Sequence, residues 1–505
     1  MPEVLLGIDA GTSAVKVCAF DRAGRMLDKA QRPVTLITVR PRWAELDLEA
    51  YWDSLADAIG EIVARLGSPV SLGLATTCPT TVLLDEDLRP VRCGITYLDN
   101  RAGGLVERFE QVFRGADAFF AKTGNRLSPS TASVLTVRWV MENEPEAWRR
   151  VCHVGFLNSF LAARLTGQVG VDWTQASYSG LFALHKPGRA WDPKLLNAFG
   201  IDGTRLPPIL APYERLGVVG AEASARTSVE SGVPVAIGGA DTATAAFALG
   251  INEARTAFES VGTSGVVSYC LDEPKFDPTF LNRCHVVPDR WLAHGAMSTA
   301  GGAFGWLKDK VWPEFNSLAD LERVAAGSPP GANGVVFLPY LCGERSPIWD
   351  PAASGSWVGL RMDTSRADLV RAAFEGTAFG LRQIVSRAET SWNWRPKHML
   401  CVGGGASSRF WVQIKADVLG IEFTCADLPD AAGFGAALLG GIAAGIWNGV
   451  DDPALPQVRA EGETVRPSDG ADTDVYRRAA AIYDDLYPAL AGQMARLAAC
   501  FTVPG

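Results

Sequence analysis

The sequence is poor in the residues that build metal sites and disulfide frameworks. Its 505 residues include only five histidines, and its ten cysteines are scattered without C-x-x-C spacing. Because neither residue type shows the spacing of metal ligands, we expect no structural metal site. The cysteines are predicted to be reduced residues of the protein interior.

Long apolar runs and an excess of positive charge are also missing. No stretch approaches the span of a bilayer, and no basic segment followed by an apolar run marks a signal peptide. We therefore expect a cytoplasmic protein without a membrane partner. The formal charge of −9 argues against a nucleic-acid partner, which would need a basic face. The apolar stretch 431–446 contains five glycines and is predicted to be a closely packed helix.

What the chain does contain is a five-residue turn that occurs twice. Asp9-Ala10-Gly11-Thr12-Ser13 follows one apolar run, and Ser260-Val261-Gly262-Thr263-Ser264 follows another about half the chain later. A length of 505 residues is long for one hydrophobic core, so two domains are expected. The repeated turn predicts two related domains that close on one nucleotide.

Strand patterns alternate with helix patterns and place the chain in the α/β class. Asp47 is expected to cap a helix that Gly67 ends. A packed helix between Thr242 and Thr256 is expected to join the two halves. The remaining predicted strands are 4–8, 14–20, 25–30, 70–75, 233–237, 334–340 and 398–402, and the remaining predicted helices are 138–148, 156–165, 297–310, 366–386, 406–419 and 474–497.

The first turn offers several groups that suit a phosphate. Gly11 lets a ligand approach the backbone because it has no Cβ, and Thr12 and Ser13 provide backbone and hydroxyl donors. Asp9 ends the strand with a carboxylate suited to a metal ion, directly or through water. The alternative is an ordinary hairpin turn with a solvated aspartate.

Asp241 is the residue that most directly suggests catalysis. It follows the predicted strand 233–237 and two glycines, and it precedes a run of small residues typical of a helix. An aspartate there either caps the helix or serves as a general base for a hydroxyl, and the two roles are compatible. The helix terminus is expected to keep the carboxylate ionised.

Three further segments leave two interpretations open. Gly403–Ser408 lies between a strand and a helix and either admits a nucleotide or simply starts the helix. It matches neither the Walker loop nor the dinucleotide fingerprint. Arg345 either faces an anion or, as we favour, pairs with Glu344. The segment Trp43–Asp47 either touches a sugar or only staples and caps a helix.

These segments together resemble the FGGY carbohydrate kinases of the actin/hexokinase-type ATPase group, and most closely the xylulose kinases among them. The resemblance extends over nearly the whole chain. The segments that carry it are Gly7–Ser13 with Lys16, Trp43–Asp47, Tyr97–Ala102, Arg164–Gly167, Gly238–Thr242, Gly262–Ser264, Leu338–Arg345 and Gly403–Ala406.

The family implies an α/β fold of two ribonuclease-H-like domains with an interdomain active-site cleft. A sugar-binding domain is expected over residues 1–245 and a nucleotide-binding domain over residues 246–505. The implied reaction is ATP-dependent phosphorylation of a primary hydroxyl on a small sugar, with Mg²⁺ as cofactor. A homodimer is also implied.

The resemblance also assigns roles to individual residues. Asp241 matches the catalytic base, and Asp9 matches the carboxylate near the metal, which we expect to act through water. The implied acceptor-binding residues are Thr77, Cys78, Pro79, Asp99 and Asp241. The implied nucleotide-binding residues are Thr12, Ser13, Lys16, Gly262, Thr263, Gly301, Gly404, Gly405 and Ser408.

The segment Thr76–Thr81 departs from the family pattern. Xylulose kinases usually carry Gln-Met-His-Gly at this place, and here the histidine is missing. D-xylulose or a related ketose is the acceptor that the resemblance favours. Ribulose, erythrulose, a polyol or a signalling sugar are the alternatives. The alternative from a different functional class is a non-kinase actin-like ATPase or a sugar-binding regulator.

Overall fold

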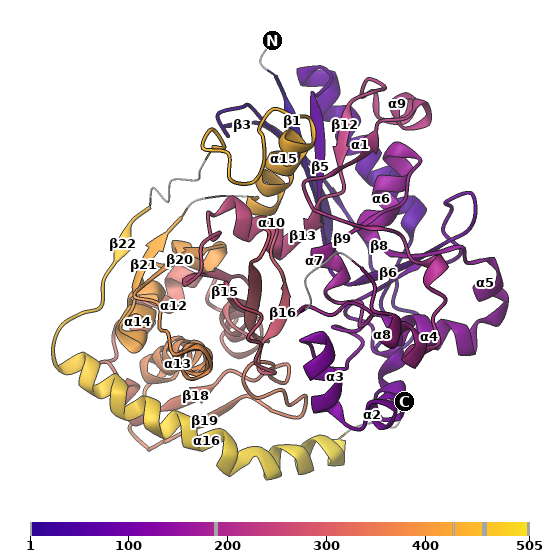
Figure 1. Ribbon diagram of the computed structural model, residues 1–505. Helices are drawn as coiled ribbons and strands as arrows, with labels where there is room; N and C mark the ends of the chain where they lie inside the picture. The colour runs from indigo at the N-terminus through magenta and orange to yellow at the C-terminus, as the bar shows by residue number, and fades with distance from the viewer. Residues whose placement is uncertain (1–2, 186–189, 427, 429, 457–461, 502–505) are drawn as a thin grey trace.

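Two seven-stranded sheets form the frame of the protein, one in each half of the chain (Figure 1). The computed structural model describes residues 3–185, 190–426, 428, 430–456 and 462–501. The first sheet has the order β11 (Arg215–Val218), β12 (Pro234–Ala236), β5 (Ser71–Thr76), β1 (Leu5–Ala10), β2 (Ala14–Phe20), β3 (Met26–Pro33), with β13 (Gly239–Ala240) also paired to β5.

The second sheet repeats the central pattern of the first. In each sheet a strand pairs antiparallel with the next strand of the chain and parallel with a later one: β1 with β2 and β5, and β14 with β15 and β20. This correspondence confirms the predicted α/β class. The second order is β16 (Leu281–Cys284), β17 (Trp291–Met297), β15 (Gly265–Leu271), β14 (Thr256–Val261), β20 (His398–Val402), β21 (Glu422–Cys425), β22 (Thr464–Val465).

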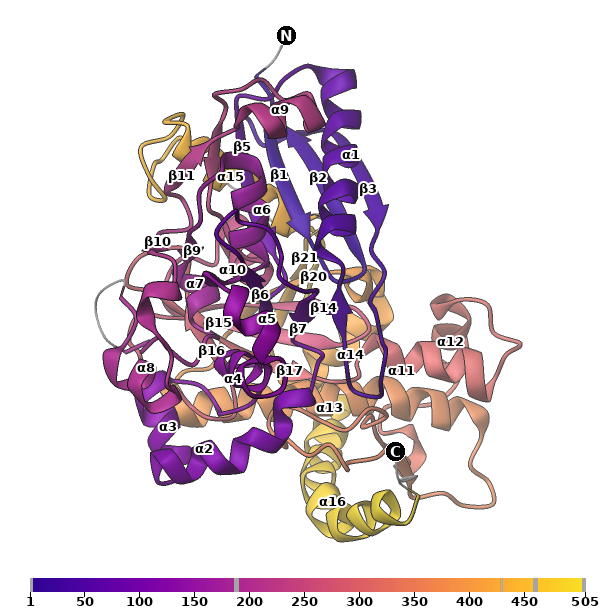
Figure 2. The same ribbon diagram turned by 90° about the vertical axis from the view of Figure 1, so that its right-hand side faces the viewer.

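Helix α1 (Leu48–Leu66) packs against β2 and β3 on one face of the first sheet (Figure 2). It begins and ends as predicted, because Asp47 accepts hydrogen bonds from two backbone N–H groups of the first turn and Gly67 follows its last turn. The other helices of this half are α2 (Val106–Phe113), α3 (Ala116–Thr123), α4 (Val134–Asn143), α5 (Pro145–Arg150), α6 (Leu157–Thr166), α7 (Trp173–Ala176), α8 (Pro193–Phe199) and α9 (Ala221–Thr227).

One predicted helix, 138–148, is wrong. The chain forms α4 and α5 instead, and the break falls at Glu144, just before Pro145. Proline disfavours helical backbone in the residue before it, so the longer helix cannot continue. Both helices pack near a smaller sheet of the order β4 (Glu45–Leu46), β7 (Gly94–Thr96), β6 (Thr80–Leu84), β8 (His153–Phe156).

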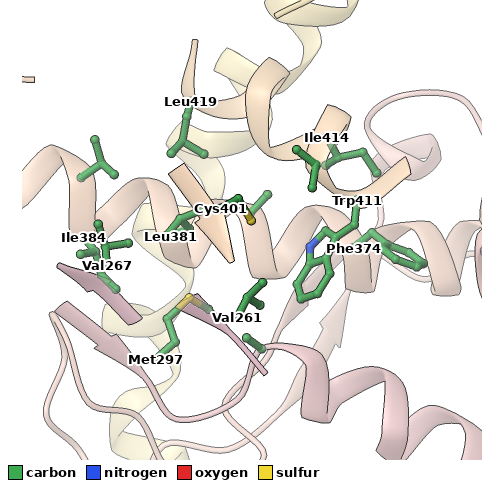
Figure 3. Close-up of a cluster of buried hydrophobic side chains, with 14 of the residues drawn as sticks. Val261, Val267, Met297, Phe374, Leu381, Ile384, Cys401, Trp411, Ile414 and Leu419 are labelled. Atoms are coloured by element: carbon green, nitrogen blue, oxygen red, sulfur yellow. The ribbon is translucent and has the colours of Figure 1, made fainter. Parts of the chain in front are cut away.

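The core of the second half lies between its sheet and the long helix α13 (Arg366–Trp392). Figure 3 shows part of this core, with Val261 and Cys401 on strands and Phe374 and Trp411 on helices. Ser365 caps α13 in a capping box with Asp368. The other helices of this half are α11 (Gly301–Trp306), α12 (Leu318–Ala325), α14 (Arg409–Leu419) and α16 (Ala471–Phe501).

Helices α10 (Asp241–Ala248) and α15 (Ala431–Ala443) pack against each other and share one buried cluster with residues of both sheets (Figure 1). Helix α15 also packs against β1 and β5, although it comes from the end of the chain. A Cβ on Gly440 would lie 2.7 Å from the carbonyl carbon of Leu72, so only glycine permits this approach. The predictions of a joining helix and of a closely packed glycine-rich helix are both confirmed.

Candidate active site

A cavity of about 620 Å³ lies where the two halves face each other. Thr77, Cys78 and Asp241 contribute to its wall from the first half of the chain. Arg283 and Arg345 contribute from the second half. The cavity therefore combines a half-buried carboxylate with two guanidinium groups, which is an arrangement suited to an oxygen-rich, polar ligand.

Asp241 is the first residue of α10, and Ala240 occupies the cap position before it. One carboxylate oxygen accepts a hydrogen bond of 2.6 Å from the backbone N–H of Thr242. Burial raises the pKa of Asp241 to about 6, while the charge of Arg283 opposes that rise. The helix terminus was expected to keep this carboxylate ionised by lowering its pKa. Loss of contact with water has the larger effect on the pKa and raises it. At neutral pH the carboxylate is still mostly ionised, as a general base requires.

A buried polar network fixes the backbone that carries Asp241. The hydroxyl of Thr174 accepts a 2.8 Å hydrogen bond from the backbone N–H of Ala240 and donates one to Asp172. Asn158 donates to the other oxygen of Asp172 at 2.9 Å. Burial raises the pKa of Asp172 to about 7. Sequence reasoning missed these residues, because they lie far from Asp241 along the chain.

The first turn presents Thr12 and Ser13 at its tip, where Ser13 is exposed. The turn closes through a 3.1 Å hydrogen bond from the N–H of Gly11 to the carbonyl of Ala14. Tyr51 of α1 donates its hydroxyl to the carbonyl of Gly11 at 2.9 Å, so the helix holds the turn in place. The backbone of the turn is therefore held in one conformation, with Ser13 accessible to a ligand.

Asp9 and Lys16 face each other across β1 and β2. The Lys16 ammonium lies 3.4 Å from Asp9 and 3.0 Å from Asp430, the residue before α15. Lys29 also pairs with Asp430, at 2.6 Å. Burial raises the pKa of Asp9, and Lys16 opposes the rise. A carboxylate and an ammonium thus lie beside the first turn.

The second turn is one residue tighter than the first. Val261 pairs with Gly265, whereas the equivalent Ala10 pairs with Val15. The carbonyl of Gly262 accepts a 3.0 Å hydrogen bond from the N–H of Gly301, at the start of α11. The tip, Gly262-Thr263, is exposed.

The glycine-rich segment after β20 approaches the same tip. A Cβ on Gly403 would lie 2.6 Å from the carbonyl oxygen of Val261, whereas Gly404 is exposed with open space around it. Gly405 packs against Val261 and Trp411. Ser408 caps α14 and donates to Glu322 at 2.5 Å. The structure therefore brings the predicted nucleotide residues of the second half close together.

The predicted acceptor residues divide into two groups. Thr77 and Cys78 line the cavity with Asp241, whereas Pro79 and Asp99 are outside its lining. Asp99 is buried, and both of its carboxylate oxygens accept hydrogen bonds from Arg101. Its contacts with Arg101 fix the segment that follows the cavity residue Leu98.

The two open interpretations of Trp43–Asp47 and Arg345 are now answered by contacts. The Arg101 guanidinium lies 3.8 Å from the centre of the Trp43 ring, so the half-buried Trp43 packs against Arg101, and Asp47 caps α1. Arg345 donates to the carbonyl of Met297 at 2.9 Å and lines the cavity. Glu344 accepts instead from the backbone N–H groups of Ser298 and Arg345.

Two sheets of one topology, each with an exposed turn, flank an interdomain cavity lined by the carboxylate of Asp241. This combination defines a phosphotransferase of the actin/hexokinase-type ATPase group. Residues 4–248 match the N-terminal domain, and residues 257–444 the C-terminal domain, of the FGGY family of carbohydrate kinases. The chain belongs to this family and is a carbohydrate kinase that uses ATP.

Relatives that align over most of their length support this assignment. The xylulose kinase of Escherichia coli K12 is 30% identical over 87% of this chain and 90% of its own. The gluconokinase of Bacillus licheniformis is 25% identical over 88% of each. The solved xylulose kinase of Rhodospirillum rubrum is 30% identical with a TM-score of 0.89, covering 97% of this chain and 100% of its own. The fold is therefore the predicted pair of ribonuclease-H-like domains with a cleft between them.

Proposed function

We propose that the protein transfers the γ-phosphoryl group of ATP to a primary hydroxyl of a small sugar, with D-xylulose or a related ketose as the first candidate acceptor. The observation that carries the proposal is the carboxylate of Asp241, which lines a cavity together with Ser264 of the second turn. The names of the xylulose kinase relatives support the choice of acceptor.

Asp241 is the proposed general base. Its pKa of about 6 leaves it mostly ionised at neutral pH, so it can accept the proton of the acceptor hydroxyl. The hydroxyl oxygen then bonds to the γ-phosphorus as the bond to the β-phosphate oxygen breaks, and ADP leaves. Positioning and charge stabilisation supply most of the rate enhancement in such a transfer.

The two turns are the proposed nucleotide site. Asp9 is half-buried, so it suits a Mg²⁺ ion that is held through water and by the phosphates of ATP rather than in a cage of protein ligands. Within the described ranges, no three His, Cys, Asp or Glu side chains gather as a metal site. When bound, the ion would offset phosphate charge. The proposed nucleotide residues are Thr12, Ser13, Lys16, Gly262, Thr263, Gly301, Gly404, Gly405 and Ser408.

The domain bounds, the acceptor residues, the oligomeric state and the cellular location stay predictions. We propose that domains 1–245 and 246–505 close on the substrates, with Thr77, Cys78, Pro79 and Asp99 on the acceptor side. A homodimer and a cytoplasmic location are further predictions from the sequence. In the described parts of the chain, no helix is long and apolar enough to cross a membrane.

A coupled assay of ADP release with a panel of acceptors tests the proposal. D-xylulose, ribulose, erythrulose, polyols and sugar acids are each added to the protein with ATP and Mg²⁺. We expect acceptor-dependent ADP release that Asp241→Asn nearly abolishes. ADP release that is equally fast without any acceptor would overturn the assignment. A sugar acid is the second candidate acceptor, because of the environment of Arg283.

A further inference from the structure

Arg283, on strand β16, is a buried cation in the wall of the cavity that contains Asp241. Only 4% of its surface is exposed. Its guanidinium carbon lies 4.2 Å from the centre of the Tyr178 ring, which fixes one face of the group. Packing therefore fixes the position of the guanidinium group, and this group lines the cavity.

The hydrogen-bonding groups around Arg283 lack partners within the protein. Its Nε and Nη1 donors have no acceptor among the described residues. The Nε2 of His294, a residue that lines the same cavity, likewise has none there. Native proteins rarely leave such groups buried and unpaired, because each loses its contacts with water. A cluster of them in one cavity indicates a ligand with several oxygen atoms.

The charge of Arg283 decides which oxygen-bearing group suits the site. Asp241 and Asp172 influence it electrostatically, yet its Nε and Nη1 atoms donate to no carboxylate in the described parts of the chain. A sugar hydroxyl would accept one hydrogen bond but would bring no further negative charge to the guanidinium. A carboxylate accepts hydrogen bonds from two donors of a planar guanidinium and neutralises the charge as well.

We propose that Arg283 is a specificity-determining residue that binds the carboxylate of a polyhydroxy acid, an aldonate, as acceptor. The acid lies in the cavity with its carboxylate on Arg283 and its terminal primary hydroxyl at Asp241. This inference rests on the proposed kinase reaction and ranks the second candidate acceptor, a sugar acid, above the first. It favours sugar acids over neutral ketoses of the same length.

Matched acceptors test the inference. D-xylonate and xylitol differ only in the terminal group, as do D-gluconate and D-glucitol, and D-xylulose is the reference ketose. The kcat/KM of each acid should exceed that of its neutral partner by about 10-fold or more, the effect of a charge-assisted hydrogen bond. Arg283→Gln should lower this acid-to-neutral ratio by about 10- to 100-fold, mainly through KM.

Arg345→Gln is the matched control, because it removes a guanidinium from the same cavity whose Nη2 already donates to Met297. Its acid-to-neutral ratio should stay near that of the unmodified protein. Because both acceptors use one base, the ratio is insensitive to changes in the pKa of Asp241. A ratio below one in the unmodified protein, or one that Arg283→Gln leaves unchanged, would overturn the inference.

A binding measurement separates this inference from the proposed reaction. D-gluconate alone, without ATP, should raise the Tm of the unmodified protein, and Arg283→Gln should remove that shift. If D-xylulose is phosphorylated but D-gluconate neither binds nor reacts, the inference fails and the kinase proposal stands. If no acceptor is phosphorylated but D-gluconate binds through Arg283, the kinase proposal fails and the carboxylate site stands.

Discussion

Asp430, which immediately precedes α15, lies 3.0 Å from the ammonium of Lys16 on β2. A residue near the end of the chain thus holds a lysine beside the first turn. Lys29 pairs with the same Asp430 at 2.6 Å, but Lys16 alone of the two also lies against Asp9. The two lysines therefore share Asp430 as a partner, but only Lys16 also contacts Asp9. They form a matched pair for substitution.

Lys16→Met is expected to weaken ATP binding. If Lys16 contacts the phosphates, its loss removes a charge-assisted contact and raises the KM for ATP by about 10-fold. Lys29→Met removes an equal charge from the same carboxylate and should change this KM by less than about twofold, because the Lys29 ammonium pairs with Asp430 and not with Asp9. Steady-state kinetics with varied ATP give both values. Equal effects of the two variants would assign Lys16 a structural role only.

The rate should fall in acid as Asp241 becomes protonated. Burial raises its pKa to about 6, and a general base works only in its ionised form. We therefore expect kcat/KM for the acceptor to be constant above neutral pH and to decrease tenfold per pH unit well below 6. A pH profile measured with saturating ATP provides the test. An acid limb near 4 would show that the buried carboxylate is not the titrating base.

Gly301→Ala should disturb the second turn. A Cβ there would clash with the carbonyl oxygen of Gly262, which the N–H of Gly301 also binds. Backbone cannot yield as a flexible side chain does, so we expect a loss of about 1–3 kcal/mol in the free energy of unfolding and weaker ATP binding. Gly305 lies in the same helix with open space around it. Gly305→Ala is the control and should be neutral or stabilising.

Features encoded by neighbouring residues were predictable from the sequence. Asp47 and Gly67 mark the ends of α1 because caps act within one helical turn. The break between α4 and α5 was also encoded locally, by Pro145, although the apolar pattern suggested one helix. The glycine-rich segment after β20 lies beside the second turn, because the parallel strands β14 and β20 bring their carboxyl ends to one edge of a sheet.

Features that depend on distant residues were not predictable. Tyr51 looks like a core residue in the sequence, and only the fold shows that its hydroxyl holds Gly11. The charge on Asp430 gave no sign of its pairing with Lys16, since the two are separated by most of the chain. Arg283 is an ordinary charged residue in a strand pattern until the structure places it in the cavity. Burial and partners of such groups are properties of the assembled domains.

The buried ion pair between Lys415 and Glu259 should contribute strongly to the stability of the second half. The Lys415 ammonium lies 2.8 Å and 2.9 Å from the two carboxylate oxygens, and the side chains are 2% and 3% exposed. Lys415→Met would leave the Glu259 carboxylate buried without a counter-charge. We expect a loss of about 3–5 kcal/mol in the free energy of unfolding, measured by urea denaturation.

Two comparisons separate this pairing from a general effect of charge. Arg466 pairs with Glu422 on the surface, where its side chain is 73% exposed, so Arg466→Met should cost less than about 1 kcal/mol. In the double variant Lys415→Met with Glu259→Leu no charge remains buried, and the free energy of unfolding should recover most of the loss, because apolar replacements of both partners often match a buried ion pair. A double variant as unstable as Lys415→Met alone would mean that lost packing against Trp411, whose ring lies 4.2 Å from the ammonium, causes the destabilisation instead.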